Sequence, residues 1–118
     1  MAYKKTPVTV GSDSVGVTEL KVELKDEVAL GATTAIDWSL GITFTKVLSA
    51  GWTMTFTNPI VGKTIMVVTN GAFSITLPSG CDTNDIVNYD TAKRNVLYIT
   101  CVSNVIPLYS ISDKSYTI

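Results

Sequence analysis

The carboxylates that could perform acid–base chemistry lie mostly in one polar stretch, residues 81–94. This stretch contains Asp82, Asp85 and Asp90, while Asp37 lies upstream beside an apolar run. Two carboxylic acids facing each other across a groove are enough to hydrolyse a glycosidic bond. In such loops, however, Asp and Asn side chains more often bond to their own backbone and form turns. We therefore interpret these residues as turn formers and predict no catalytic residue.

Metal and nucleophile chemistry has little support in the sequence. Asp82, Asn84 and Asp85 offer oxygens to calcium, but their spacing differs from that of an EF-hand, which needs a central glycine and a distal glutamate. The chain has no histidine. The commonest general base, the usual catalytic zinc ligand and the histidine-activated nucleophiles are therefore missing. We expect a protein that binds no metal or cofactor and is not an enzyme.

The two cysteines, Cys81 and Cys101, are too few for a disulfide scaffold or a closed zinc site. Cys101 lies in an apolar run and is predicted to be a small buried hydrophobe, whereas Cys81 follows Ser79-Gly80 in a turn. The first residues have two lysines but no apolar run behind them, unlike a secretory signal peptide. Synthesis in a reducing cytoplasm is therefore expected, with both thiols reduced.

The composition is apolar for a chain with so few charges. Hydrophobic residues make up 46% and charged residues 16% of the sequence, and the mean hydropathy is +0.31. Either a partner covers part of the apolar surface, or the value reflects the Val, Ile and Tyr that build strands. A net charge of −1 with interspersed signs predicts binding to neither nucleic acid nor anionic membranes. The apolar runs are too short to cross a bilayer.

Short apolar runs alternate with turn residues along most of the chain, which is typical of a sandwich or small barrel. In the clearest alternation, Trp52, Met54 and Phe56 point to one side and the intervening threonines to the other, as in a half-buried antiparallel strand. Gly41 separates two further runs, which form one kinked strand or two strands. The expected strands cover residues 36–40, 42–48, 52–57, 64–69, 73–77, 95–103 and 105–112.

Asn70-Gly71 is the strongest local signal, and it predicts a type I′ hairpin that joins residues 64–69 to residues 73–77. Residues 64–69 are apolar on both faces of the expected strand, so both faces should be buried.

The last two runs are expected to form a second strand pair with a tight turn at Ser103-Asn104. Residues 95–103 are again apolar on both faces. Pro107 lacks an amide hydrogen and should place the final strand at an edge or a bulge.

The chain divides near Gly31 into an N-terminal arm, residues 1–30, and a β-domain, residues 31–118. The arm is densely charged and has no aromatic residue after Tyr3, so it has too little apolar area to order alone. We predict a mainly β protein, a small antiparallel β-sandwich or barrel-like domain with an extended arm and at most a short helix. A helical stripe and a strand alternation both fit the arm. The candidate oligomerisation or attachment residues are Val17, Leu20, Leu24 and Val28.

Several strings in the chain resemble the β-domains at the ends of bacteriophage tail-fibre and head-fibre proteins. Thr53–Pro59 reads TMTFTNP, Gly62–Thr69 reads GKTIMVVT, and Ser74–Gly80 reads SITLPSG; Asn95–Ser110 matches the strand pair that closes those domains. Upstream, Val15-Gly16 and Thr18-Glu19-Leu20 are similar to the repeats of trimeric fibre stalks. Only one copy is present, which favours a compact head decoration or short fibre over a long shaft.

The resemblance implies a structural role in the virion after synthesis in the host bacterial cytoplasm. It also implies a homotrimer attached to a capsid or tail protein through the N-terminal arm. The alternative is a carbohydrate-binding module that recognises a host surface glycan. Such a module would need exposed aromatic rings, for which Tyr89 and Tyr116 are the candidates, or a polar groove at a subunit boundary.

Overall fold

The computed structural model describes residues 27–117 and is mainly β, which confirms the expected small β-domain. These residues form nine strands and two short 3-10 helices: β1 (Val28–Ala29), β2 (Ala35–Asp37), η1 (Trp38–Leu40), β3 (Thr43–Val47), β4 (Trp52–Thr53), β5 (Thr55–Thr57), β6 (Thr64–Asn70), β7 (Ile75–Thr76), η2 (Thr83–Asp85), β8 (Arg94–Ser103) and β9 (Leu108–Tyr116).

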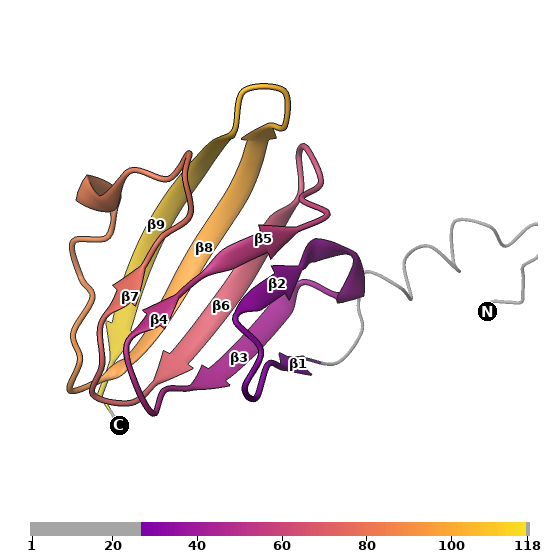
Figure 1. Ribbon diagram of the computed structural model, residues 1–118. Coiled ribbons are helices and arrows are strands. Elements are labelled where there is room, and N and C mark those ends of the chain that lie inside the picture. Colours follow the sequence, from indigo (N-terminus) through magenta and orange to yellow (C-terminus); the bar gives the residue numbers. More distant parts are fainter. Residues whose placement is uncertain (1–26, 118) are drawn as a thin grey trace, which may run out of the picture.

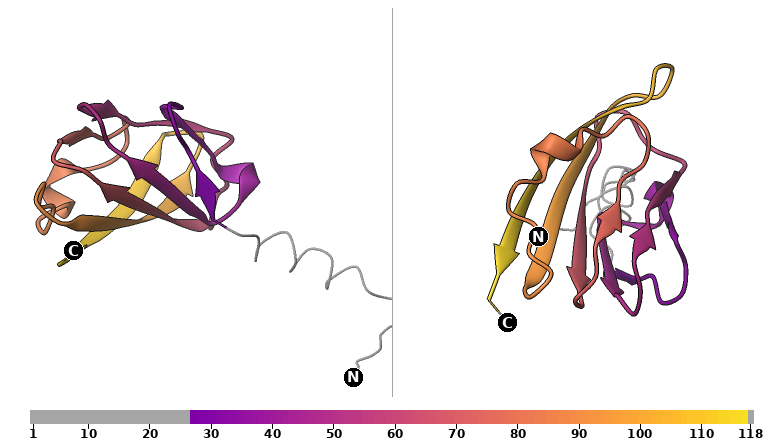
Figure 2. Two further views of the ribbon diagram at one scale, coloured as in Figure 1. Left: turned by 90° about the horizontal axis from the view of Figure 1, so that it is seen from below. Right: turned by 60° about the vertical axis from the view of Figure 1, so that its left-hand side comes forward.

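The strands form two facing layers (Figures 1 and 2). One layer is a five-stranded sheet in the order β1-β3-β6-β8-β9. The other consists of two small parallel pairs, β2-β5 and β4-β7. β4 and β5 belong to one extended segment that bonds to β7 on one side and to β2 on the other, through Trp52 N–Ser74 O (3.1 Å) and Thr55 N–Thr34 O (3.3 Å).

The strands in the first part of the chain wind back and forth between the two layers and do not form hairpins. From β2 to β7 the chain passes alternately from one layer to the other, so neighbouring strands within a layer run in the same direction. The pairings β1-β3, β3-β6, β2-β5 and β4-β7 are all parallel. Only β6-β8 and β8-β9 are antiparallel, so the expectation of an antiparallel domain holds for the C-terminal part alone.

The predicted hairpin at Asn70-Gly71 is wrong. The Asn70 carbonyl accepts the amide of Leu48 at 2.7 Å, so β6 ends against the end of β3 and the chain then crosses to the other layer. Gly71 has a φ of +129°, and a Cβ there would lie 2.6 Å from the Leu48 carbonyl oxygen. The glycine is needed for a close backbone approach at the crossing, and not for a type I′ turn.

The alternation of residues 52–57 is confirmed. Trp52 and Met54 are buried and Phe56 is half-buried, whereas the threonines between them are exposed. The runs on either side of Gly41 are separate, because β2 leads into η1 and then into β3 in the opposite layer. The chain leaves β2 at Asp37, whose carboxylate accepts the Ser39 amide at 3.0 Å and caps η1.

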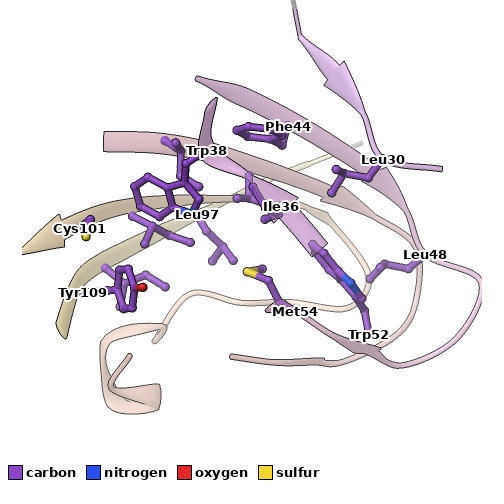
Figure 3. Close-up of a cluster of buried hydrophobic side chains, with 14 residues drawn as sticks. Leu30, Ile36, Trp38, Phe44, Leu48, Trp52, Met54, Leu97, Cys101 and Tyr109 are labelled. Carbon is purple, nitrogen blue, oxygen red and sulfur yellow. The ribbon is translucent and has the colours of Figure 1, made fainter. Parts of the chain in front are cut away.

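The core fills the space between the two layers (Figure 3). At one end Trp38 lies edge-on to Phe56, with ring centroids 5.3 Å apart, and Tyr109 contacts both rings. At the other end Trp52 lies near Leu48, and its indole nitrogen donates to the Thr34 carbonyl at 3.1 Å. The remaining buried apolar residues are Leu30, Ile36, Phe44, Met54, Ile65, Val67, Leu97, Ile99, Cys101 and Ile111.

The β-domain begins before Gly31, the boundary expected from the sequence. Val28 and Ala29 form β1 and pair in parallel with Phe44 and Thr45 of β3. Leu30 is 8% exposed and belongs to the core. Residues 28–30 therefore belong to the domain, because an apolar stretch next to a free sheet edge gains both hydrogen bonds and burial.

The turn between β8 and β9 is longer than the expected turn at Ser103-Asn104. It covers residues 104–107, so Val105 and Ile106 lie in the turn and not in a strand. Pro107 has no amide to pair, and β9 begins at the next residue. The prediction that the final strand is an edge strand is confirmed.

Candidate functional site

Asp37 has a structural function at the end of β2. Its carboxylate accepts the Ser39 hydroxyl at 2.6 Å, the Ser39 amide at 3.0 Å and the Asn58 amide group at 3.2 Å. The hydrogen bond from the Ser39 hydroxyl, followed by those from the Ser39 backbone and Asn58, lowers the pKa of Asp37. These bonds stabilise a carboxylate that links the η1 turn to the loop after β5.

Two of the three carboxylates of residues 81–94, those of Asp82 and Asp90, likewise stabilise turns. Asp82 accepts the Asn84 amide at 2.9 Å and caps η2, and Asp90 accepts the Ala92 amide at 2.9 Å. Each bonds to the backbone two residues ahead, as expected of turn-forming Asp residues. Within residues 27–117, no group of three or more Asp, Glu, Cys or His residues could hold a metal ion.

A buried amide holds this polar stretch against the sheet. Asn95 is 1% exposed; its side-chain oxygen accepts the Asp90 amide at 2.9 Å, and its side-chain nitrogen donates to the Asp90 and Lys93 carbonyls at 2.8 and 3.1 Å. At the far side of the loop, the Asn88 amide donates to the Asp113 carboxylate at 3.0 Å. The loop is thus fastened to β8 and to the edge strand β9.

Both cysteines are free. Cys101 is buried in β8, as predicted, and burial raises its pKa. Cys81 is half-buried, and burial raises its pKa to about 11. Because the thiolate is the nucleophile, these raised pKa values oppose nucleophilic chemistry.

The outer face of the five-stranded sheet is the first of two candidate interaction surfaces. Within residues 27–117 no second layer covers it (Figure 2). Strand register places the half-buried Met66 beside Tyr98, and the half-buried Val68 beside Val96. The edge of this apolar centre is polar and carries Thr43, Thr45, Thr64, Thr100, Ser112 and Lys114.

The expectation that β6 is buried on both faces is therefore met on only one. Ile65, Val67 and Thr69 point into the core and are at most 1% exposed, whereas Met66 and Val68 remain partly open to solvent. On the same outer face, Tyr98 has a raised pKa, chiefly because of a hydrogen bond with the Tyr116 side chain.

The second candidate surface, which we name the apolar end, lies at the top of Figure 1. There the loop between β5 and β6 meets the turn between β8 and β9, joined by the Gly62 N–Cys101 O bond (2.8 Å) and the Asn104 Nδ2–Pro59 O bond (2.9 Å). Six large apolar side chains are exposed on it: Ile60, Val61, Val102, Val105, Ile106 and Leu108.

Of the four predicted attachment residues, only Val28 lies within the described residues. It is half-buried in β1 and packs against the core. Val28 therefore packs within the domain, and its assignment to oligomerisation or attachment stays a prediction. Val17, Leu20 and Leu24 lie outside the described residues, and their assignment stays a prediction.

The two aromatic candidates for glycan recognition lie apart. Tyr89 is half-buried and donates its hydroxyl to the Phe73 carbonyl at 2.8 Å. Tyr116 is 40% exposed on the outer sheet face, with the Lys114 ammonium 5.2 Å from its ring centroid. A pocket of about 340 Å³ lies over β3, β6 and the start of β8 on the outer face of the five-stranded sheet. None of its described lining residues is aromatic: Glu27, Thr45, Lys46, Val47, Val68, Asn70 and Arg94. These features give the glycan alternative no built stacking surface.

No protein-family model, curated protein or solved structure matches the chain. Among residues 27–117, none of the helices is long and apolar enough to cross a membrane. The described residues thus define a two-layer β-domain with two apolar surfaces.

Proposed function

We propose that this chain is a non-enzymatic structural protein of a bacteriophage particle, either a head decoration or a short fibre. It acts as a homotrimer in the virion, and the residues before β1 attach it to a capsid or tail protein. The observation that carries the proposal is the apolar centre on the outer face of the five-stranded sheet.

The outer face of the five-stranded sheet resembles a protein interface whose partner is missing. Parallel strands such as β3 and β6 are normally covered on both faces. Met66, Val68 and Tyr98 nevertheless stay half-buried, although their neighbours on the same strands are fully buried. An apolar centre with a hydroxyl-rich rim is the usual composition of a specific protein interface. A second and a third copy of the same face supply the missing layer.

The chemistry of the domain agrees with a structural role. Asp37, Asp82 and Asp90 stabilise turns through their carboxylates, and Asn95 fastens a loop. The sequence resemblance to phage fibre and head-fibre domains supplies the class of particle and the trimeric state.

The oligomeric state tests the interface. We expect a trimer by multi-angle light scattering at micromolar concentration, and dissociation when Val68→Glu places a charge in the centre of the outer face. Val87→Glu is the matched control, because Val87 is 78% exposed in the polar loop and should leave the trimer intact. A monodisperse species of 12.7 kDa for the unaltered chain would contradict the proposal.

Incorporation into particles tests the attachment. A chain that begins at Glu27 keeps β1 and Leu30, so it should fold and oligomerise but be lost from virions purified after infection. Equal incorporation of this truncated chain and the full chain would show that the β-domain itself makes the contact. Specific binding on a glycan array would instead support the receptor-recognition alternative.

A further inference from the structure

The outer face of the five-stranded sheet carries different side chains at its two edges. β1 and β3 form one edge and β9 forms the other (Figure 1). At the first edge lie the exposed Glu27 and Val47, whose side chain is 77% exposed. At the second lie the exposed Lys114 and Tyr116. Each edge therefore presents one charged and one large hydrophobic residue, and the two charges have opposite signs.

Neither of these charges is neutralised within the domain. Within residues 27–117, neither Glu27 nor Lys114 forms an ion pair with another described residue. β1 and β9 are four strand spacings apart, about 19 Å, so the two side chains cannot meet within one copy. Covering an unpaired charge is costly, and a partner that covers this face must supply the opposite charge at each edge.

A cyclic trimer brings the two edges together. Three outer faces that surround one axis place the β9 edge of each copy beside the β1-β3 edge of the next copy, in a head-to-tail contact that closes a ring. Rotation about the axis leaves the position of every residue along the axis unchanged. When the strands run along the axis, residues at one level of the sheet therefore meet across the contact.

Strand register divides the outer face into levels that are about 7 Å apart. One level contains Val47, Asn70, Arg94 and Tyr116; the next contains Thr45, Val68, Val96 and Lys114; the third contains Thr43, Met66, Tyr98 and Ser112. Glu27 belongs to the third level, because it precedes Val28, the partner of Phe44.

The residues that meet across the contact are complementary. At the first level, the hydrophobic side chain of Val47 meets the ring of Tyr116, and at the third, the hydroxyl of Thr43 meets that of Ser112. Glu27 lies one level from Lys114, about 7 Å along the strands, and the long lysine side chain spans this distance. The β9 edge therefore carries its side chains in the order that suits the β1-β3 edge of a second copy.

We propose that Lys114 and Tyr116 of one copy dock beside Glu27 and Val47 of the next copy. This contact rests on the proposed trimer and specifies how it closes. The pocket of about 340 Å³ on the outer face is lined by Glu27, Val47 and Val68, with Arg94 at its β8 side. The ring of Tyr116 covers the two valines, and the Lys114 ammonium pairs with the Glu27 carboxylate. The neighbouring copy thus fills the pocket.

Disulfide trapping tests this contact directly. In a chain with Cys81→Ser, the substitutions Val47→Cys and Tyr116→Cys together should give covalently linked trimers on a non-reducing gel after mild oxidation. β3 and β9 are three strand spacings apart, about 14 Å, so these cysteines cannot form a bridge within one copy. Either cysteine alone should give no linked product. Linked dimers from Val47→Cys alone would place like edges together and overturn the proposal.

Charge reversal tests the ion pair between copies. Glu27→Lys and Lys114→Glu each place like charges at all three contacts, and a loss of about fivefold at each contact raises the overall dissociation constant of the trimer about 100-fold at low salt. An equimolar mixture of the two variants should recover much of this loss, because two of the three contacts in every mixed trimer join opposite charges. Asp85→Lys, an exposed charge outside this face, is the control and should leave the trimer unaltered.

The oligomeric mass separates this proposal from the proposed function. A trimer by light scattering that gives no linked product and tolerates both charge reversals would overturn the contact and leave the proposed function standing. A monomeric mass for the unaltered chain would overturn both.

Discussion

Gly71→Ala gives the most direct test of the alternation of the chain between the two layers. At a φ of +129°, well away from the left-handed well near +57°, an alanine carries strain of about 1–3 kcal/mol. Its Cβ would also lie 2.6 Å from the Leu48 carbonyl oxygen and 3.0 Å from the Leu48 Cβ, both backbone-anchored atoms. Relief requires β3 and β6 to separate at this point, which breaks the 2.7 Å Leu48–Asn70 bond at a further cost of about 1 kcal/mol.

We therefore expect Gly71→Ala to lower the free energy of unfolding by about 2–4 kcal/mol, a large part of the 5–15 kcal/mol typical of a domain. Gly31→Ala is the matched control. Gly31 also has a positive φ, +58°, but nothing lies within 4 Å of an added Cβ. Its substitution should cost about 1 kcal/mol, because part of the strain is offset by the reduced entropy of the unfolded chain.

Urea unfolding followed by the fluorescence of the buried Trp38 and Trp52 measures both variants. All proteins should be compared at one concentration, because an oligomer gains stability by mass action. If Gly71→Ala and Gly31→Ala cost the same within about 0.5 kcal/mol, the close approach to Leu48 is absent. A type I′ hairpin at Asn70-Gly71 would then be the better description.

Three further predictions concern single side chains. Asn95→Leu should lower the free energy of unfolding by about 2–4 kcal/mol, because it removes three hydrogen bonds to Asp90 and Lys93. Thermal unfolding measures the loss, with Asn84→Leu as the control at an exposed position. Cys81 has a pKa of about 11 in place of 9.0, so it should react with iodoacetamide at pH 8 about 100-fold more slowly than a free thiol. Its contribution to the free energy of unfolding should be lost as the pH rises from 9 to 11, because the thiol ionises first in the unfolded chain. Because the pKa of Asp37 is lowered in the folded protein, its contribution to the free energy of unfolding is present above the unfolded pKa of 3.8 and is lost as the pH falls through the folded pKa. Asp37→Asn should therefore make the free energy of unfolding less dependent on pH in the acid range, and an unchanged pH dependence would contradict this.

The sequence predicts the faces of strands better than their partners. The alternation of Trp52, Met54 and Phe56 with threonines is a local property of the extended backbone, and burial follows it. Pairing is not local here. Asn70-Gly71 would favour a hairpin in isolation, but the Leu48 amide at the end of β3 donates to the Asn70 carbonyl, and the chain then crosses to the other layer. A two-residue turn motif contains no information about this hydrogen bond to a distant strand.

The candidate site was predicted in part. Asp82 and Asp90 form turns as expected, because that behaviour depends on residues two positions away. The apolar end was missed, since Val105 and Ile106 were assigned to a strand on their hydrophobicity alone. A signal was present in the sequence: two apolar pairs, Ile60-Val61 and Val105-Ile106, each lie next to a proline that prevents regular strand pairing.

The alternation of the chain between two layers also affects the order of folding. Every parallel pairing of the domain joins residues 16 to 23 positions apart, such as Val28 with Phe44 and Phe44 with Val67. None of these strand pairs can therefore form from residues that are close together in the sequence. Pairing of this kind closes large loops before any contact forms, and it is slow. The β8-β9 hairpin needs no such closure and can form within about 10 μs. It is also the last part of the domain to leave the ribosome, so β6 would keep an open edge until β8, residues 94–103, has been synthesised.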